Sequence, residues 1–141
     1  MIVPLPDLES LGVLAGWVAA RLRPGDAILL SGPLGAGKTA LARALLRQLA
    51  GDPGLEVPSP SFTLVQSYET RLGWVHHFDL WRLDGPGGVA ELGWDELAQD
   101  IVLVEWPDRL GELRPAAALD VALCLLPGGA RQAVLRGWES R

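Results

Sequence analysis

The segment Gly32-Pro33-Leu34-Gly35-Ala36-Gly37-Lys38-Thr39 decides the fold of this 141-residue chain. It matches the pattern G-x-x-x-x-G-K-[ST], in which backbone N–H groups surround phosphate oxygens. Its glycines allow backbone conformations that a Cβ would block, beside the positive end of the following helix. Lys38 is the only lysine, and the other 11 basic residues are arginines, whose planar guanidinium suits such a loop less well than a compact ammonium. The segment therefore predicts that the chain binds a nucleoside triphosphate.

The sequence on either side of this loop supports that prediction. Residues 27–30 form a short apolar run typical of a buried strand, and residues 40–49 have the apolar spacing and composition of a helix. Strand, glycine loop and helix thus follow in the required order. Lys38 is expected to reach the β- and γ-phosphates, and the Thr39 hydroxyl to ligate Mg²⁺. The predicted nucleotide-contacting residues are Pro33, Leu34, Gly35, Ala36, Gly37, Lys38, Thr39 and Ala40.

The rest of the chain shows a mixture of strand and helix patterns in one domain spanning residues 1–141. Asp7 is the expected cap of the first helix, and Ile101-Val102-Leu103-Val104 is expected to be a central strand buried on both faces. The strand pairs joined by short turns predict antiparallel segments, so the sheet is expected to be mixed. The expected helices cover residues 7–23 and 89–97, and the other expected strands cover residues 62–68, 74–80, 121–126 and 132–138.

Composition limits the classes of function. The net charge of −5 argues against a broad electrostatic contact with nucleic acid, so another protein is expected to hold any RNA involved. No apolar run approaches the roughly 20 residues needed to cross a membrane, and no secretory signal is recognisable, which favours the cytoplasm. Cys124, the only cysteine, has no partner for a disulfide and is expected to be a small buried hydrophobe.

Two acidic residues are candidates for the chemistry that follows nucleotide binding. Glu105 follows the apolar run 101–104, and Asp79 lies in His77-Phe78-Asp79-Leu80. Either carboxylate can hold Mg²⁺, directly or through water, while the other positions the attacking water. From the residues alone, each carboxylate is equally well explained as a helix cap or an exposed charge, and the two roles stay open.

Three hydroxyl groups gather in Ser59-Pro60-Ser61-Phe62-Thr63. Such a loop can sense the γ-phosphate as a switch segment, although a turn leading into a strand is the simpler interpretation. His76 and His77 lack the spacing of a zinc site and are expected to be strand residues, one facing inward and one outward. Trp81 and Trp106 flank the acidic candidates, where buried packing is the expected role and shaping of the site or of a partner surface the alternative.

These segments together resemble the TsaE (YjeE-type) family of bacterial ATPases, which is required for threonylcarbamoyladenosine modification of tRNA. The resemblance covers residues 32–107 and is most specific in His77-Phe78-Asp79-Leu80-Trp81-Arg82-Leu83 and Leu103-Val104-Glu105-Trp106-Pro107. Where the family usually has Ser-Pro-Thr, this chain has Ser59-Pro60-Ser61, which keeps a hydroxyl but loses a methyl group, so weaker ordering of that loop is expected.

The resemblance implies an α/β, P-loop NTPase-like mixed sheet with antiparallel strands flanked by helices. It also implies a weak Mg²⁺-dependent ATPase that is stimulated by TsaD and TsaB homologues and resets or regulates their complex, with tRNA contacted indirectly. Lys38 and Thr39 would hold phosphate and Mg²⁺, while Asp79 and Glu105 would form the acidic pair that binds metal and positions water. Ser61 and Thr63 would belong to the switch-like loop, and Trp106 would support the site or the partner contact.

Two other functions fit the phosphate loop. A small kinase that phosphorylates a hydroxyl of a small molecule uses the same loop, but its usual arginine-rich lid is not apparent. A non-catalytic module gated by nucleotide would use Asp79 and Glu105 for Mg²⁺ alone. No internal arginine finger is obvious, and Arg82 and Arg109 are the nearest candidates along the sequence.

Overall fold

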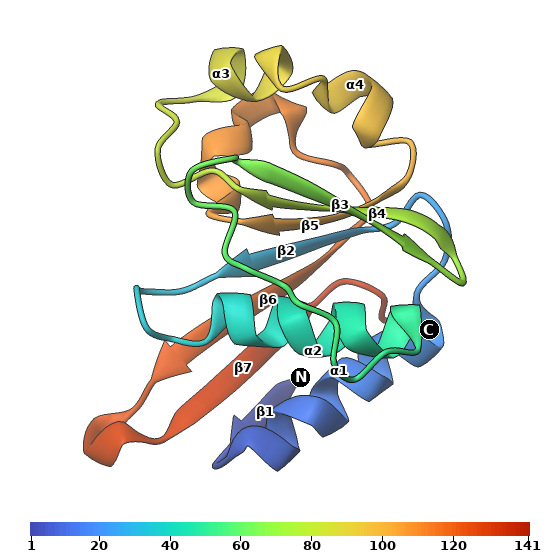
Figure 1. Ribbon diagram of the computed structural model, residues 1–141. Helices are drawn as coiled ribbons and strands as arrows, with labels where there is room; N and C mark the ends of the chain where they lie inside the picture. The colour runs from blue at the N-terminus through green and yellow to red at the C-terminus, as the bar shows by residue number, and fades with distance from the viewer.

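A seven-stranded mixed sheet runs through the whole molecule in the order β1-β7-β6-β2-β5-β4-β3 (Figure 1). The computed structural model describes residues 1–141. The strands are β1 (Ile2–Leu5), β2 (Ala27–Ser31), β3 (Val65–Thr70), β4 (Gly73–Asp79), β5 (Ile101–Glu105), β6 (Ala118–Leu125) and β7 (Arg131–Arg136). The helices are α1 (Leu8–Arg21), α2 (Lys38–Ala50), α3 (Pro86–Glu91) and α4 (Trp94–Leu97), with 3₁₀ segments η1 (Pro107–Leu113) and η2 (Pro127–Gly129).

The centre of the sheet is parallel and its two sides are antiparallel. Strand β2 pairs in parallel with both β5 and β6, and β5 pairs in parallel with β4. Strands β3, β7 and β1 add to the sides in antiparallel directions. The predicted α/β fold with antiparallel strands in a mixed sheet is confirmed, and the functional loop follows the central strand β2, where the carboxyl ends of parallel strands meet.

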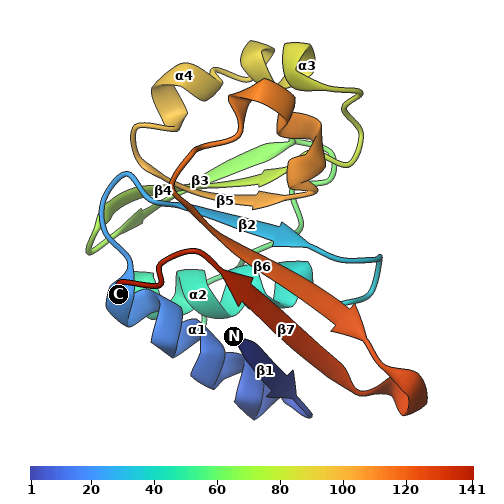
Figure 2. The same ribbon diagram turned by 180° about the vertical axis from the view of Figure 1, so that it is seen from behind.

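Helices cover both faces of the sheet, so the central strands are buried on both sides. Alternate side chains of β2 divide between two cores: Ile28 and Leu30 face α1 and α2, while Ala27 and Leu29 face α3, α4 and η1. The four apolar residues 101–104 of β5 are buried as predicted, and Glu105 at the end of the strand is buried as well. The view from behind shows α3, α4 and η1 on one side of the sheet and α1 and α2 on the other (Figure 2).

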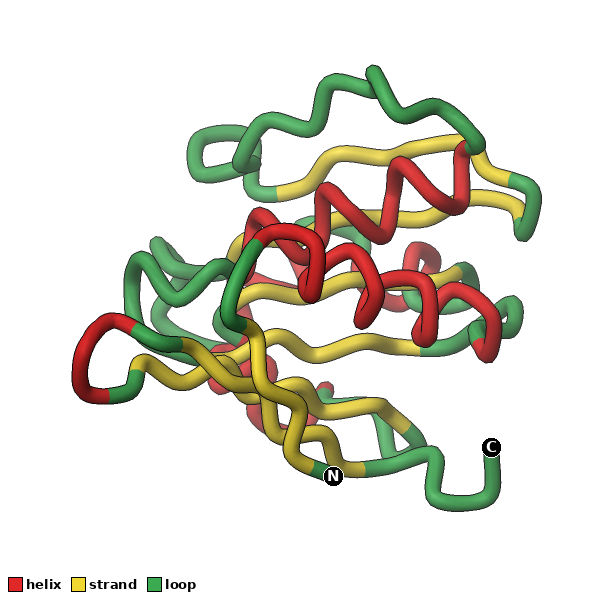
Figure 3. The backbone as a smooth tube through the Cα atoms, turned by 90° about the horizontal axis from the view of Figure 1, so that it is seen from below, coloured by secondary structure: helices red, strands yellow, loops and turns green.

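The two long helices form where the sequence predicts them, with ends within about two residues of the predicted bounds. Asp7 caps α1, because its carboxylate accepts a bond from the Ser10 N–H at 2.8 Å while the Ser10 hydroxyl lies 3.2 Å from the Asp7 N–H. Helix α2 ends at Ala50, and Gly51, which follows it as the cap, has a left-handed φ of 66°. Seen from below, α1 and α2 lie together over the strands (Figure 3). Leu8, in the first turn of α1, is exposed, whereas Leu14, Ala15 and Val18 further along the helix are buried.

Several elements differ from their predicted bounds. Strand β6 begins at Ala118 rather than at residue 121. Strand β7 ends at Arg136 rather than at residue 138, because Gly137 and Trp138 have left-handed φ values of 100° and 59°. The strand expected from residue 62 begins at Val65, because the Leu64 N–H donates to Pro60 O at 2.7 Å and closes a turn first. The helix expected over residues 89–97 is two short helices, since Gly93 between them has a left-handed φ of 86°. Strand β1 was not predicted.

Two further expectations concern burial and membranes. Cys124 is half-buried rather than buried, because it alternates with Leu123 on β6 and faces away from the core. None of the helices is both long and apolar enough to span a membrane.

Removal of buried leucine atoms tests the core between α2 and the sheet. Leu46 on α2 is fully buried, whereas Leu8 on α1 is 78% exposed. We expect Leu46→Ala to lower the free energy of unfolding by about 2–5 kcal/mol, through lost burial and the cavity left behind. Leu8→Ala, the matched control, should change it by less than about 0.5 kcal/mol. Urea unfolding measures both, and equal losses would contradict this packing.

Candidate active site

The phosphate loop connects β2 to α2 and leaves the amino end of α2 open. Gly37 precedes the helix with a left-handed φ of 105°, and no side chain caps the helix. The first turn of α2 also lacks an acidic residue. Gly32 anchors the loop against β6, because a Cβ there would lie only 2.5 Å from Leu123 O. The open N–H groups and the helix dipole together favour an anion at this position.

Lys38 is held inside the loop. The side chain is buried, and its ammonium donates to Gly32 O and, at 3.1 Å, to Pro33 O. The nitrogen also lies 4.0 Å from the centre of the Trp106 ring. Burial lowers the pKa of Lys38, and the negative charges of Glu105 and Asp79 oppose that shift. The ammonium therefore faces acidic groups across a small space without forming a direct ion pair.

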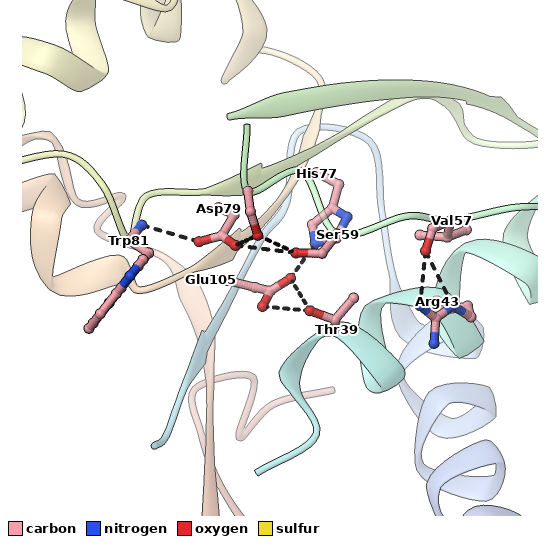
Figure 4. A network of polar contacts seen from close by, with 9 residues as sticks. Thr39, Arg43, Val57, Ser59, His77, Asp79, Trp81 and Glu105 are labelled. Carbon is pink, nitrogen blue, oxygen red and sulfur yellow. Dashed lines mark hydrogen bonds and ion pairs between the residues drawn. The ribbon is translucent and has the colours of Figure 1, made fainter. Parts of the chain in front are cut away.

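Glu105, at the end of β5, joins three elements through hydrogen bonds (Figure 4). Thr39 Oγ1 on α2 lies 3.0 Å from each carboxylate oxygen, and His77 Nε2 on β4 lies 2.6 Å from Oε2. Because the carboxylate accepts, Nε2 carries the His77 proton, and Nδ1 is buried without a partner. The Glu105 carboxylate is thereby held between the first turn of α2 and strand β4.

Asp79 lies directly beside Glu105, since β4 and β5 pair these two residues in register. Its Oδ2 accepts from the hydroxyls of Ser59 and Ser61 at 3.4 and 3.3 Å, and its Oδ1 accepts from the Trp81 N–H at 3.1 Å. The loop that carries both serines is tied to α2 by Arg43, which donates to Val57 O at 3.1–3.2 Å (Figure 4). The hydroxyl-bearing segment is therefore attached to the acidic pair.

The two histidines do not divide into one inward and one outward residue. Both are buried, because the sheet is covered on both faces. His76 lies between Ser67 Oγ, 2.7 Å from its Nδ1, and Asp100 Oδ2, 2.9 Å from its Nε2. The contact of His77 with Glu105 was not predicted from the sequence. The two-residue spacing between His77 and Asp79 does indicate that these two side chains lie on the same face of a strand.

Other predicted residues lie at or beyond the edge of the site. Thr63 Oγ1 accepts from Gln66 at 3.0 Å and does not line the cavity. Trp81, expected to be buried, is 45% exposed and packs on Trp106 with ring centres 4.5 Å apart. Trp106 has a left-handed φ of 60°, which turns its ring over Lys38 immediately after Glu105.

The two arginines named as the nearest candidates for an arginine finger make contacts outside the cavity. Arg82 stacks on Phe62 at 4.4 Å, and Arg109 forms an ion pair with Asp108. Neither arginine lines the cavity between the loop and the acidic pair.

Most of the predicted site residues line one cavity of about 380 Å³. Pro33 and Ala36 belong to the loop but do not line the cavity. Arg131 does line it, although no sequence pattern pointed to this residue. The lining residues are Leu34, Gly35, Gly37, Lys38, Thr39, Ala40, Ser59, Ser61, Asp79, Trp81, Glu105, Trp106 and Arg131.

The oxygen atoms of this cavity fit a hard cation bound together with phosphate. No group of three or more histidine, cysteine or acidic side chains in the chain is placed to hold a metal ion. Thr39, Asp79 and Glu105 instead supply a hydroxyl and two carboxylates, and Mg²⁺ commonly takes its remaining ligands from phosphate and water.

Comparison with known proteins decides the family. The family model for threonylcarbamoyl adenosine biosynthesis protein TsaE matches residues 5–132. The chain belongs to the TsaE family. Among TsaE relatives, the tRNA threonylcarbamoyladenosine biosynthesis protein TsaE of Rickettsia felis is 36% identical over 123 residues, covering 86% of this chain and 71% of the relative. The protein of the same name from Nostoc is 36% identical over 138 residues, covering 92% and 81%.

A solved structure supports the same assignment of the TsaE fold. The crystal structure of Bacillus subtilis YdiB superposes with a TM-score of 0.82 at 26% sequence identity. The superposition covers 100% of this chain and 87% of YdiB. The fold of the whole chain, including the antiparallel sides of the sheet, is therefore shared.

The only lysine of this TsaE family member allows a direct test of its environment. Burial disfavours the charged ammonium, so the pKa of Lys38 should lie below the ordinary 10.5 in the nucleotide-free protein. Between that lowered pKa and 10.5 the unfolded chain binds more protons, so Lys38 makes stability rise with pH in this window. A pH titration of the ¹³Cε signal after ¹³C-lysine labelling gives one resonance to follow, and the same protein in urea is the control. A folded-state pKa equal to or above the unfolded value would contradict the burial of the ammonium.

Proposed function

We propose that this protein binds ATP with Mg²⁺ in the cavity between the phosphate loop and the acidic pair, and hydrolyses it slowly. It would do so as an accessory subunit of the machinery that makes threonylcarbamoyladenosine in tRNA, where hydrolysis resets or regulates a complex of TsaB and TsaD homologues. The observation that carries the proposal is the convergence of Lys38 and Thr39 with Asp79 and Glu105 at the open end of α2. Membership of the TsaE family supports the pathway.

Lys38 and the loop would bind the phosphates. Without phosphate, the ammonium donates to two carbonyls of its own loop, Gly32 O and Pro33 O. Phosphate oxygens are stronger, charged acceptors, so they would compete for these donors. The uncapped first turn of α2 would add backbone N–H groups to the same anion.

Thr39, Asp79 and Glu105 would serve the metal and the attacking water. When bound, Mg²⁺ would neutralise charge on the phosphates. Glu105 is held by Thr39 and His77, whereas Asp79 is held by the serine hydroxyls and the Trp81 N–H. The division of the two roles between these carboxylates stays open, but both carboxylates are fixed in orientation and both line one cavity.

Partner proteins would raise the rate of ATP hydrolysis. The two arginines nearest the motifs are engaged elsewhere, Arg82 with Phe62 and Arg109 with Asp108, so a stimulating group would come from a partner. Trp81, which lines the cavity, is 45% exposed, and Phe62, next in the chain to the lining residue Ser61, is 82% exposed. Both aromatic rings would provide contact area for a partner. The acidic net charge fits contact with tRNA through the partners, in the cytoplasm.

Phosphate release from ATP tests the proposal. The protein with Mg²⁺ should release phosphate slowly on its own and much faster after a TsaB–TsaD pair is added. Lys38→Ala is the blank and should abolish release, because the loop then lacks its only ammonium. No release from the wild type under either condition, with ATP bound, would leave a nucleotide-gated binding module. Nucleotide-dependent phosphorylation of an added small-molecule hydroxyl would favour the kinase.

Substitution of Glu105 is expected to separate ATP binding from ATP hydrolysis. Glu105→Gln keeps the size and one acceptor toward Thr39, so ATP affinity should change by less than about tenfold. Partner-stimulated hydrolysis should fall by about 10²-fold or more, because the charge acting on metal or water is lost. Asp108→Asn, at an exposed position with the same chemical change, is the control. An undiminished stimulated rate in Glu105→Gln would remove Glu105 from the catalytic site.

A further inference from the structure

Arg131 is a residue from the far end of the sequence that reaches the phosphate loop. It is the first residue of β7 and follows the η2 turn at the tip of the β6–β7 hairpin. Figures 1 and 2 both show this tip and the loop between β2 and α2 on the same side of the molecule. The close approach of Gly32 to Leu123 O on β6 holds the two segments together.

The guanidinium lies beside the amino end of α2. A Cβ placed on Gly37 would lie 3.8 Å from Arg131 Nη1. Arg131 lines the 380 Å³ cavity that contains the acidic pair, and it also lines a second cavity of about 180 Å³. The second cavity includes Gly37, Leu5 and Leu11 but neither Asp79 nor Glu105. Arg131 and Gly37 are thus shared between two cavities that lie side by side.

The Arg131 side chain is free to bind a ligand, while its backbone is fixed. The guanidinium makes no ion pair in the structure, whereas Arg109, Arg114 and Arg141 each pair with an aspartate. Strand β7 lies between two others, and Arg131 is in register with Leu5 of β1 and Leu125 of β6. A charged, unpaired guanidinium on a backbone paired on both sides is well prepared to bind an anion.

We propose that Arg131 binds the inner phosphates of the nucleotide, supplied within the chain by the β6–β7 hairpin. The inference rests on the proposed function for the position of ATP. With the terminal phosphate beside Asp79 and Glu105, the phosphate chain runs past Gly37 toward the second cavity, and its inner phosphates lie next to Arg131. The planar guanidinium donates two parallel hydrogen bonds to phosphate oxygens. Since ADP retains the inner phosphates, Arg131 contributes equally to the binding of ADP and ATP.

Calorimetry with ADP and with ATP, each with Mg²⁺, tests this role. We expect Arg131→Gln to weaken both nucleotides by a similar factor of about ten to a hundred, the range for a charged hydrogen bond. Arg131→Lys should recover only part of the affinity, since it keeps the charge but not the paired donors. Arg136→Gln removes an exposed arginine at the other end of the same strand and should leave both affinities unchanged.

The other possible results of these binding measurements each contradict one part of the proposal. Unchanged affinity for both nucleotides in Arg131→Gln would remove Arg131 from the site. A loss for ATP alone, or a loss of hydrolysis at unchanged affinity, would place the guanidinium at the terminal phosphate and contradict the inner position. Absence of nucleotide binding by the wild type would overturn the proposed function itself. Thermal unfolding of each variant, expected to match the wild type because Arg131 is exposed, confirms that the fold is kept.

Discussion

The burial of the Glu105 carboxylate is the constraint on which the site depends. An ionised carboxylate can be buried only if its oxygens accept hydrogen bonds, because burial of an unpaired charge is very costly. Glu105 is 3% exposed, and its acceptors are satisfied by Thr39 from α2 and His77 from β4. The requirement thus fixes α2 and β4 relative to β5, and it orients the end of the phosphate loop. The same side chain thus connects these elements and contributes a carboxylate to the proposed site.

The parallel pairing of the central strands brings the second carboxylate into place. Strand β5 pairs with β2 on one side and β4 on the other, with Glu105 opposite both Leu30 and Asp79. A shift of β4 by one residue would turn Asp79 to the other face of the sheet and replace it with an apolar neighbour, Phe78 or Leu80. The apolar side chains of β4 and β2 that enter the core oppose such a shift. Core packing therefore maintains the distance between the two acidic groups.

The sequence predicts those parts of the site that are contiguous or periodic. The phosphate loop, β2, α2 and β5 follow from a motif and from apolar runs, and Asp79 and Glu105 follow from their positions at strand ends. Contacts between distant segments could not be predicted in this way. The bond between His77 and Glu105 depends on strand register, and the approach of Arg131 to Gly37 depends on how the terminal hairpin joins the sheet. The split between α3 and α4 depends on one left-handed glycine, Gly93, which a helical pattern tolerates.

Two left-handed residues other than glycine border the site, and their positions follow from the same constraints. Leu64 has a φ of 70° and lies where the serine-containing loop enters β3, while Trp106 has a φ of 60° directly after Glu105. Such conformations cost about 1–3 kcal/mol each and persist only where surrounding contacts determine them. The Leu64 carbonyl accepts from the Asp79 N–H at 3.0 Å, and the Trp106 ring covers the Lys38 ammonium. Leu64 thus contacts the backbone of Asp79 and Trp106 contacts the ammonium of Lys38, so relaxing either backbone would shift Asp79 or uncover Lys38. Both left-handed residues thus lie where contacts with Asp79 and Lys38 help to hold their backbones in place.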